Sequence, residues 1–332
     1  MKKIFYILLC LFYSYLLQAQ DPHFSQFFAS PQFTNPALVG IGSGNWRVMS
    51  NYRNQWGDAG TAFNTKTFAG DITFSRKNLE DNHFGLGLTF MTDESLQGAF
   101  KSTYASSSVA YQVKLDEYHR LGLGVQALFG NRLIDFSRLT FGEQFTSGGF
   151  DMSLPSGETA LANMKPFLSV GAGLLYSYNN KDNLNVDIGM AGFNLNQPRQ
   201  TFLKDIREFL PASYVAHFNM EYIISDRFLV SMNSIYKQQA TQNYFTLGGA
   251  VGMEISGGAQ THYIFTGLYF RKGDALYPYF GLQLNSFQIG LSYDITTSAQ
   301  VKGPIAPHSF EFSLILKQPI KFQGSIPCPG VK

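Results

Sequence analysis

The stretch NWRVMSNYRNQWG, from Asn45 to Gly57, alternates between two kinds of side chain. One face is largely apolar and aromatic and consists of Trp46, Val48, Ser50, Tyr52, Asn54 and Trp56. The other face is polar and carries Asn45, Arg47, Met49, Asn51, Arg53 and Gln55. A period of two residues predicts a β-strand. An apolar face opposite a charged one is typical of a strand that separates lipid from the polar interior of a barrel.

The same alternation recurs along the chain and is most regular in FQIGLSYDI, from Phe287 to Ile295. It predicts fourteen strands, at residues 45–56, 66–76, 83–91, 104–115, 120–130, 166–178, 184–194, 212–224, 227–238, 244–256, 261–272, 275–285, 286–297 and 308–319. Most span about ten to thirteen residues. Transmembrane strands need about 9–11 residues, whereas strands of soluble proteins usually have about 5–6. These lengths favour a membrane barrel over a soluble sandwich.

The connections between these strands also differ in length in a regular way. They are short after every even-numbered strand, and long after strands 1, 5, 7 and 13, at residues 57–65, 131–165, 195–211 and 298–307. Outer-membrane barrels have short periplasmic turns and longer outer loops, and lipid forces every backbone group in a sheet to pair, so the sheet must close. We therefore predict an all-β, 14-stranded antiparallel transmembrane barrel over residues 45–319, surrounded by outer-membrane lipid.

The two ends of the chain are expected to lie in the periplasm. Residues 1–19 are typical of a signal peptide, since Lys2 and Lys3 precede an apolar run that ends at Leu17. A membrane anchor is the alternative, although this run is short for a span. Residues 20–44 are predicted to form a periplasmic segment, which either plugs the periplasmic mouth or packs along the rim. Residues 320–332 are predicted to form a periplasmic tail.

Composition excludes several classes of protein. Only 14% of residues are charged, against about 25% in average soluble proteins. Removing Lys2 and Lys3 from the 25 basic residues leaves 23, which equals the number of acidic residues. A neutral chain gives no basis for nucleic-acid binding. Cys328 is the only cysteine outside the signal peptide, so no internal disulfide is expected.

The sequence offers no clear catalytic, cofactor or metal site. The six histidines have no metal-ligand spacing. His217 and Asn219 project inward together, but Ser213 lies two pleats from His217, about 13 Å along the strand. No Gly-x-Ser-x-Gly motif occurs. We therefore expect a protein without enzymatic activity.

Five polar residues are predicted to face the lumen near the seam where the first and last strands meet. They are Arg47, Asn51, Arg53, Asp71 and Glu311, with Asp71 expected at the height of Asn51. These residues either line the lumen without a specific role, hold the seam together, or form a solute or partner site. The loop from Gly130 to Lys165 leaves two alternatives open, because it could fold into the lumen or face outward.

Several fragments together resemble the PorP/SprF family of outer-membrane proteins in the type IX secretion system of the Bacteroidota. They are QDPHFSQFFASPQFTNPALVG at the start of the mature chain, YRNQW, NLNQP, GLYFRKGDALYPYFGLQLNSFQIGLSYDITTS and a terminal Cys-Pro. The family residues within them include Tyr52, Arg53, Asn54, Gln55, Trp56, Arg271, Asp274, Pro278, Gly281, Gly290, Tyr293, Asp294, Cys328 and Pro329. The tail departs from the family pattern, because Gly-Val-Lys follows Pro329.

This resemblance implies an outer-membrane component of the secretion and gliding machinery. It also implies contacts with periplasmic ring or peptidoglycan-associated subunits, and with cargo such as the C-terminal domain of an adhesin. The alternative from the barrel alone is a monomeric channel for small or apolar solutes. A barrel lipase is a third hypothesis, which would require activity that depends on His217.

Overall fold

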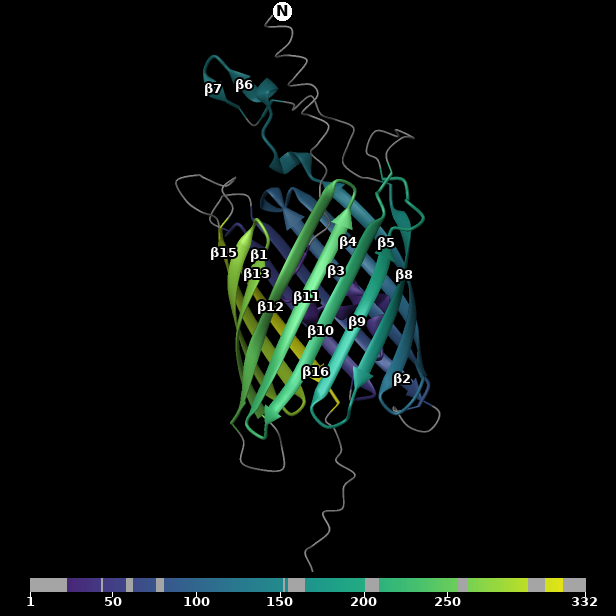
Figure 1. Cartoon of the computed structure of the whole chain (residues 1–332). Helices are drawn as coiled ribbons and strands as arrows, with labels where there is room; N and C mark the ends of the chain where they lie inside the picture. The colour runs from purple at the N-terminus through teal and green to yellow at the C-terminus, as the bar shows by residue number, and fades with distance from the viewer. Residues whose placement is uncertain are drawn as a thin grey trace, which may run out of the picture.

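The computed structural model describes residues 23–42, 44–57, 62–75, 81–151, 153–154, 165–200, 209–255, 262–297 and 308–318. Within them the chain forms a closed barrel of 14 antiparallel strands (Figure 1). The barrel strands are β1 (Trp46–Gln55), β2 (Phe63–Ser75), β3 (His83–Ser95), β4 (Phe100–Lys114), β5 (His119–Ile134), β8 (Phe167–Asn179), β9 (Leu184–Phe193), β10 (Ser213–Ser225), β11 (Phe228–Gln239), β12 (Gln242–Glu254), β13 (His262–Arg271), β14 (Ala275–Leu284), β15 (Phe287–Thr296) and β16 (Ser309–Lys317). The predicted fold class and strand number are confirmed.

The alternation in sequence becomes a lipid face and a lumen face. Along β3, Phe84, Leu86, Leu88 and Phe90 are exposed, whereas the glycines and threonine between them are buried. Each strand pairs with its neighbours in sequence, and β1 closes the barrel by pairing with both β2 and β16. Neighbouring strands are thereby hydrogen-bonded to one another around the whole circumference, as a sheet in a bilayer requires.

The two ends of the barrel carry connections of different length. At one end, tight turns join strand pairs such as β4–β5 and β14–β15. In the β4–β5 turn, the Asp116 carboxylate accepts backbone N–H groups from Tyr118 and His119 at 2.8 Å each, and these bonds lower its pKa. The opposite end carries the long loops, and it corresponds to the cell exterior in barrels of this type.

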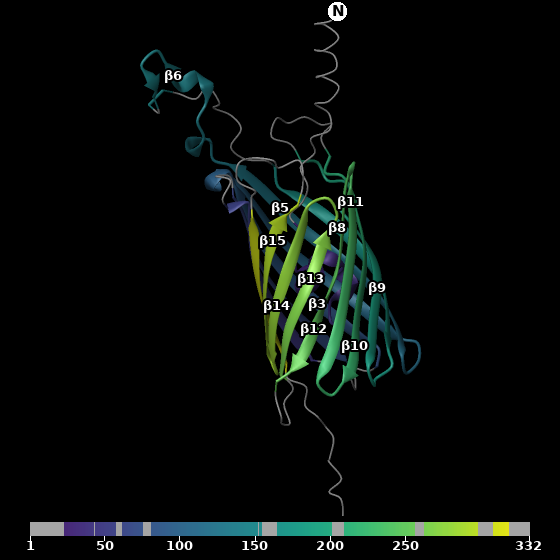
Figure 2. The ribbon, with the colours of Figure 1, turned by 60° about the vertical axis from the view of Figure 1, so that its left-hand side comes forward.

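The long loop between β5 and β8 faces outward. Its described part contains the 3-10 turns η6 (Phe136–Arg138) and η7 (Gly142–Gln144), followed by the hairpin β6 (Phe145–Thr146) and β7 (Gly149–Phe150). This hairpin stands clear of the end of the barrel (Figures 1 and 2). The described part of the loop therefore follows the outward alternative and does not enter the lumen. Among the described residues, no helix is long and apolar enough to cross a membrane.

The segment before β1 is folded inside the barrel. It contains η2 (Phe27–Ala29), α2 (Pro31–Thr34) and η3 (Pro36–Leu38). Pro31 and Pro36 lack the N–H that a strand must donate, and each instead occupies the first turn of a short helix, where that group is not needed. The Asn35 side chain caps η3 by accepting the N–H of Ala37 at 2.8 Å.

The path of this segment differs from the expected one. His23 packs against Tyr244 near the long-loop end, with ring centroids 5.2 Å apart. Gly40, at the other end of the lumen, turns with a φ of +74°, and its carbonyl accepts the Thr73 hydroxyl at 3.2 Å. The described residues therefore run through the lumen from the outer end towards the start of β1. The segment therefore neither caps the periplasmic mouth nor follows its rim. Aromatic and polar side chains of the barrel wall contact it along the whole length of the lumen. The predicted signal peptide and tail lie outside the described residues.

Candidate functional site

The segment from His23 to Ile41 contacts the barrel wall on all sides. Hydrogen bonds, ring contacts and shared apolar clusters connect it to all 14 strands. Its phenylalanines enter different parts of the wall. Phe24 packs with Met91, Tyr104 and Phe167, while Phe28 stacks on Tyr269 with centroids 5.6 Å apart. Burying such a side chain contributes about 1.5–3 kcal/mol, so these contacts hold the segment across the lumen.

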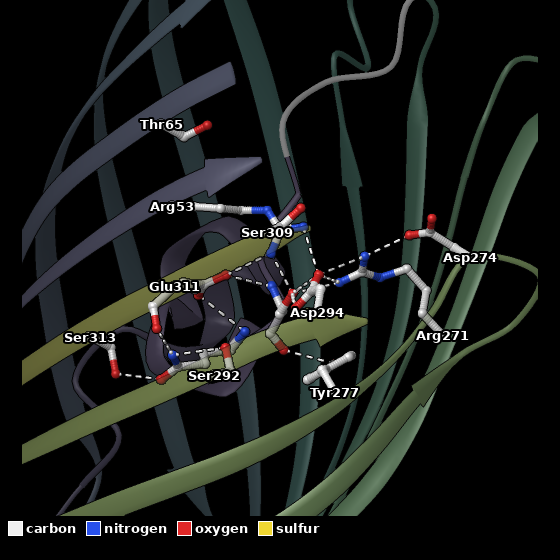
Figure 3. Close-up of polar contacts among 12 residues, drawn as sticks. Arg53, Thr65, Arg271, Asp274, Tyr277, Ser292, Asp294, Ser309, Glu311 and Ser313 are labelled. Atoms are coloured by element: carbon white, nitrogen blue, oxygen red, sulfur yellow. Dashed lines mark hydrogen bonds and ion pairs between the residues drawn. The ribbon is translucent and has the colours of Figure 1, made fainter. Parts of the chain in front are cut away.

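A charged network at the outer end surrounds the Ser25 hydroxyl. This hydroxyl donates to both oxygens of Asp294 at 2.8 Å and accepts from Arg53 and from Arg271, the latter at 2.6 Å. Asp294 lies between the two guanidinium groups (Figure 3). Its Oδ2 is 2.9 Å from Arg53 Nη2 and 3.2 Å from Arg271 Nη2. Three strands, β1, β13 and β15, thus converge on one side chain of the segment.

Glu311 binds the backbone of the same residues. Its two carboxylate oxygens accept the N–H of Ser25 at 2.7 Å and the N–H of Gln26 at 3.1 Å. Arg53 Nη1 lies 3.2 Å from the same carboxylate. The Tyr277 hydroxyl donates to the Ser25 carbonyl at 3.0 Å. The wall therefore binds backbone donors and a backbone acceptor, and not only the side chain.

The Gln26 side chain is held equally closely. Its amide nitrogen donates to Ser292 Oγ at 3.2 Å and to the Glu311 carbonyl at 2.9 Å. Its amide oxygen accepts the Ser313 hydroxyl at 2.6 Å. Gly290 leaves the space for this amide, because a Cβ there would collide with Gln26 Oε1. The wall residues Ser292 and Ser313 appear beside Glu311 in Figure 3.

The four central charges are buried and balanced. Arg53, Arg271, Asp294 and Glu311 are each at most 2% exposed. Burying a charge is costly unless it is paired and hydrogen-bonded, and here two guanidinium groups meet two carboxylates. Asp274 binds Arg271 Nη1 at 2.7 Å from the rim side. The arrangement can bind a neutral peptide tightly, because charge-assisted hydrogen bonds are the strong ones.

Further into the lumen, the segment is bound through amides. Gln32 donates to the Gly70 carbonyl at 3.1 Å and accepts the Thr89 hydroxyl at 2.5 Å. Asn35 donates to the Leu174 carbonyl at 2.8 Å and contacts His217 Nε2 at 3.1 Å. His217 therefore contacts this segment, in a setting of amides and backbone. Among the described residues, no three His, Cys, Asp or Glu side chains lie close enough to hold a metal ion.

Inward-facing glycines form the surface on which the segment lies. A Cβ on Gly124 would collide with the backbone of Pro36 and Ala37, and one on Gly173 would collide with the Asn35 amide oxygen. On β3, a Cβ on Gly85 would come within 2.5 Å of the Val39 carbonyl oxygen, and one on Gly87 within 2.9 Å of Gln32. The glycines of the alternating pattern are thus where the segment approaches the wall.

A comparison with protein families matches residues 16–316 to the type IX secretion system membrane protein PorP/SprF. The chain belongs to the PorP/SprF family. The match includes all of the described segment and almost the whole barrel. The protein is therefore a membrane component of the type IX secretion system, and it is located in the outer membrane. A comparison with curated proteins finds no significant match.

Solved structures of outer-membrane channels share the fold of this PorP/SprF chain. A Pseudomonas aeruginosa FadL homologue is 11% identical, with a TM-score of 0.51, and the match covers 88% of this chain and 94% of that chain. A deltaS2 mutant of the TodX monoaromatic hydrocarbon channel is also 11% identical, with a TM-score of 0.50, and the match covers 86% and 93%. At such identity the likeness concerns the fold alone.

The predicted seam residues fall into two groups. Arg53 and Glu311 are directly opposite each other across the β1–β16 seam and form an ion pair. Arg47 and Asp71 pair at 2.7 Å between β1 and β2, near the other end. Asp71 is therefore level with Arg47 and not with Asn51, because the strand register shifts it by four residues. The Nδ2 of the buried Asn51 has no hydrogen-bond partner among the described residues.

The family residues of β1 outside the network support the outer end of the strand. Tyr52 and Asn54 both donate to the Asn64 amide oxygen, at 3.1 and 2.7 Å. The strand ends at Gln55, and Trp56 turns away with a positive φ of 59° while its ring packs on Phe63.

Family residues on β14 and β15 shape the wall beside the network. Pro278 faces outward, and the pairing of β14 with β15 is interrupted next to it, since proline has no N–H to donate. A Cβ on Gly281 would come within 2.6 Å of the Tyr279 hydroxyl. The exposed Tyr293 stacks on His308. Cys328 and Pro329 lie outside the described residues.

Several residues of the site were not singled out by the sequence. Ser25, Gln26, Tyr277, Ser292 and Ser313 all take part in its hydrogen bonds. Their positions were predictable in part, because the alternation places Ser292 and Ser313 on the lumen face, whereas residues 275–285, which contain Tyr277, are apolar on both faces. Nothing in the local pattern connected them to Ser25 and Gln26, which lie 286 and 285 residues from Glu311.

Replacing Asn35 with alanine should loosen the segment. The substitution removes the cap of η3, which contributes about 0.5–2 kcal/mol, and the contact with the Leu174 carbonyl. We expect faster cleavage of residues 24–41 by proteinase K in the folded, detergent-solubilised protein. Asn51→Ala is the matched control, since the Asn51 Nδ2 has no partner among the described residues. Equal cleavage rates in the two variants would contradict the role of Asn35.

Proposed function

We propose that the protein is a non-enzymatic outer-membrane component of type IX secretion that supports the secretion or surface attachment of a cognate, adhesin-like cargo. We further propose that its short turns face periplasmic ring or peptidoglycan-associated subunits. The observation that supports this function is the occupied lumen. The inner wall of the barrel binds a segment of polypeptide through contacts from every strand, and this favours a role in binding polypeptide. A solute channel would instead need a continuous passage through the lumen.

The charged network supports a binding role over a conducting one. Two guanidinium groups and two carboxylates of the wall surround the uncharged residues Ser25 and Gln26. Charged side chains of this kind select a ligand by its hydrogen-bonding groups. A role as a solute channel rests on the shape of the barrel alone. The inward imidazole of His217 contacts Asn35 and Asn219, which supports a structural part for the residue suggested as catalytic.

The test is genetic and biochemical. An affinity tag placed in the exposed turn at Ser147–Gly148, outside the barrel, should retain periplasmic secretion subunits and a cargo C-terminal domain from solubilised envelopes. The same tag on an unrelated barrel of similar abundance is the control. Deleting the gene should retain the cargo inside the cell. A tagged protein that purifies alone, together with unchanged secretion in the deletion strain, would overturn the proposal.

A further inference from the structure

The pocket around Ser25 and Gln26 satisfies the polar atoms of this dipeptide almost one by one. Two successive N–H groups share the carboxylate of Glu311, and the carbonyl between them accepts from Tyr277. The hydroxyl and the amide each have at least three partners on the wall. An apolar side chain at either position would leave buried polar groups without partners, which is strongly unfavourable. The pocket is therefore selective for the sequence it binds.

The neighbouring residues extend this selectivity to aromatic side chains. Phe24 enters a cluster with Met91 and Tyr104, and Phe27 enters another with Val215 and Ile235. The preferred order along the peptide is thus aromatic, serine, glutamine, aromatic. The pocket has the features of a peptide-binding site, with backbone bonds for affinity and side-chain sockets for specificity.

The charges of the pocket all belong to the wall, and they remain paired without the segment. Arg53 pairs with Asp294 and with Glu311, and Arg271 pairs with Asp294, in contacts that do not pass through Ser25. If the segment leaves, these groups meet water in balanced pairs. The wall around Ser25 and Gln26 therefore keeps its charges paired when this part of the pocket is vacated. The apolar clusters that hold Phe24 and Phe27 would be exposed, so they need a replacing peptide with aromatic side chains at the same positions.

We propose that this pocket is a receptor for a polypeptide segment supplied in trans by the exported partner, and that residues 24–28 occupy it when no partner is bound. The ligand is an uncharged segment with the order aromatic, serine, glutamine, aromatic. This inference rests on the proposed function, and it defines the chemistry by which the barrel recognises its cargo. The pocket lies towards the long-loop end, which faces the cell surface in barrels of this type, and the fully buried Ser25 and Gln26 must leave it before a partner can enter.

The tether to β1 favours the chain's own segment over any competitor. Residues 42–45 join the segment to the first strand, and a short linker of this kind gives an effective concentration of about millimolar. Cutting this connection in the folded protein removes the advantage without changing the pocket. A protease site inserted between Gly42 and Asn45 of the full-length chain provides the cut after folding.

The probe is a fluorescent synthetic peptide with the sequence of residues 21–41, and binding is followed by fluorescence anisotropy. After cutting and a brief wash in dilute urea, the barrel should bind the peptide saturably. Peptides carrying Ser25→Ala or Gln26→Ala should bind at least about tenfold more weakly, a difference of about 1.4 kcal/mol. A Ser30→Ala peptide should bind like the unmodified one, because the Ser30 hydroxyl has no partner among the described residues. The uncut protein should bind none of them.

Two results would overturn the receptor. One is a cut, washed barrel that takes up no peptide, and the other is uptake that ignores the identity of residues 25 and 26. The proposed function is tested by a different result. If the barrel binds the peptide selectively but secretion is normal in the deletion strain, the proposed function is refuted and the receptor proposal stands. If secretion is lost in the deletion strain but the barrel shows no selective peptide binding, the receptor proposal is refuted and the proposed function stands.

Discussion

Arg53→Met is expected to destabilise the folded barrel by about 3–5 kcal/mol, the cost of removing one partner from a buried ion pair. Arg53 is 1% exposed and contacts Ser25, Asp294 and Glu311. Methionine fills a similar volume but leaves both carboxylates with Arg271 as the only central cation. The variant should unfold at a markedly lower temperature, seen as the loss of the compact band on unboiled gels, and at a lower urea concentration.

Lys101→Met is the matched control for this substitution. Lys101 pairs with Glu94 at 3.0 Å, also towards the outer end, but both side chains are substantially exposed. Exposed pairs contribute about 0–1 kcal/mol. The double variant Arg53→Met with Glu311→Gln should recover part of the loss, because it restores equal numbers of buried charges. If Arg53→Met and Lys101→Met unfold at the same temperature and urea concentration, the charged network does not stabilise the barrel.

Gly124→Val is expected to displace the segment from the lumen and to open the barrel to ions. The added side chain would collide with the backbone of Pro36 and Ala37, which cannot move aside as a flexible side chain can. Valine itself suits a strand, so the wall should still form. In planar bilayers the wild-type protein should conduct little, and the variant should show a steady current typical of a water-filled barrel.

Gly70→Val provides the comparison. It also lies in a barrel strand, but a Cβ there meets only ordinary contacts at 3.6 Å or more. Its conductance should remain at the wild-type level, and its segment should stay protected from proteinase K. A wild-type protein that conducts as well as Gly124→Val would show that the segment does not close the lumen.

The strands and their faces followed from the alternation of side chains, and the match is close. FQIGLSYDI was predicted as a strand over residues 286–297 and forms β15 from Phe287 to Thr296. Arg53 and Glu311 were both assigned to the lumen side near the seam, where they meet. The predicted height of Asp71 along the barrel was wrong by four residues, since Asp71 is opposite Arg47 and not Asn51. The length of the loop between β1 and β2 does not define the register in which these two strands pair.

The path of the segment before β1 could not be predicted in this way. Prolines are unfavourable inside a strand and phenylalanines favour burial, but neither feature specifies which part of the barrel wall the segment contacts. The sequence left a plug at the mouth and a peptide on the rim as alternatives, and the segment instead extends through the lumen.

Local alternation was enough to specify a closed outer-membrane barrel, because backbone groups in lipid must pair with neighbouring strands. The site required the tertiary structure, since Ser25 meets Glu311, Asp294, Arg271 and Arg53 from four different strands. Which lumen residues face one another depends on the stagger and tilt of the closed barrel. These quantities arise from all the strands together, so no single stretch of sequence contains them.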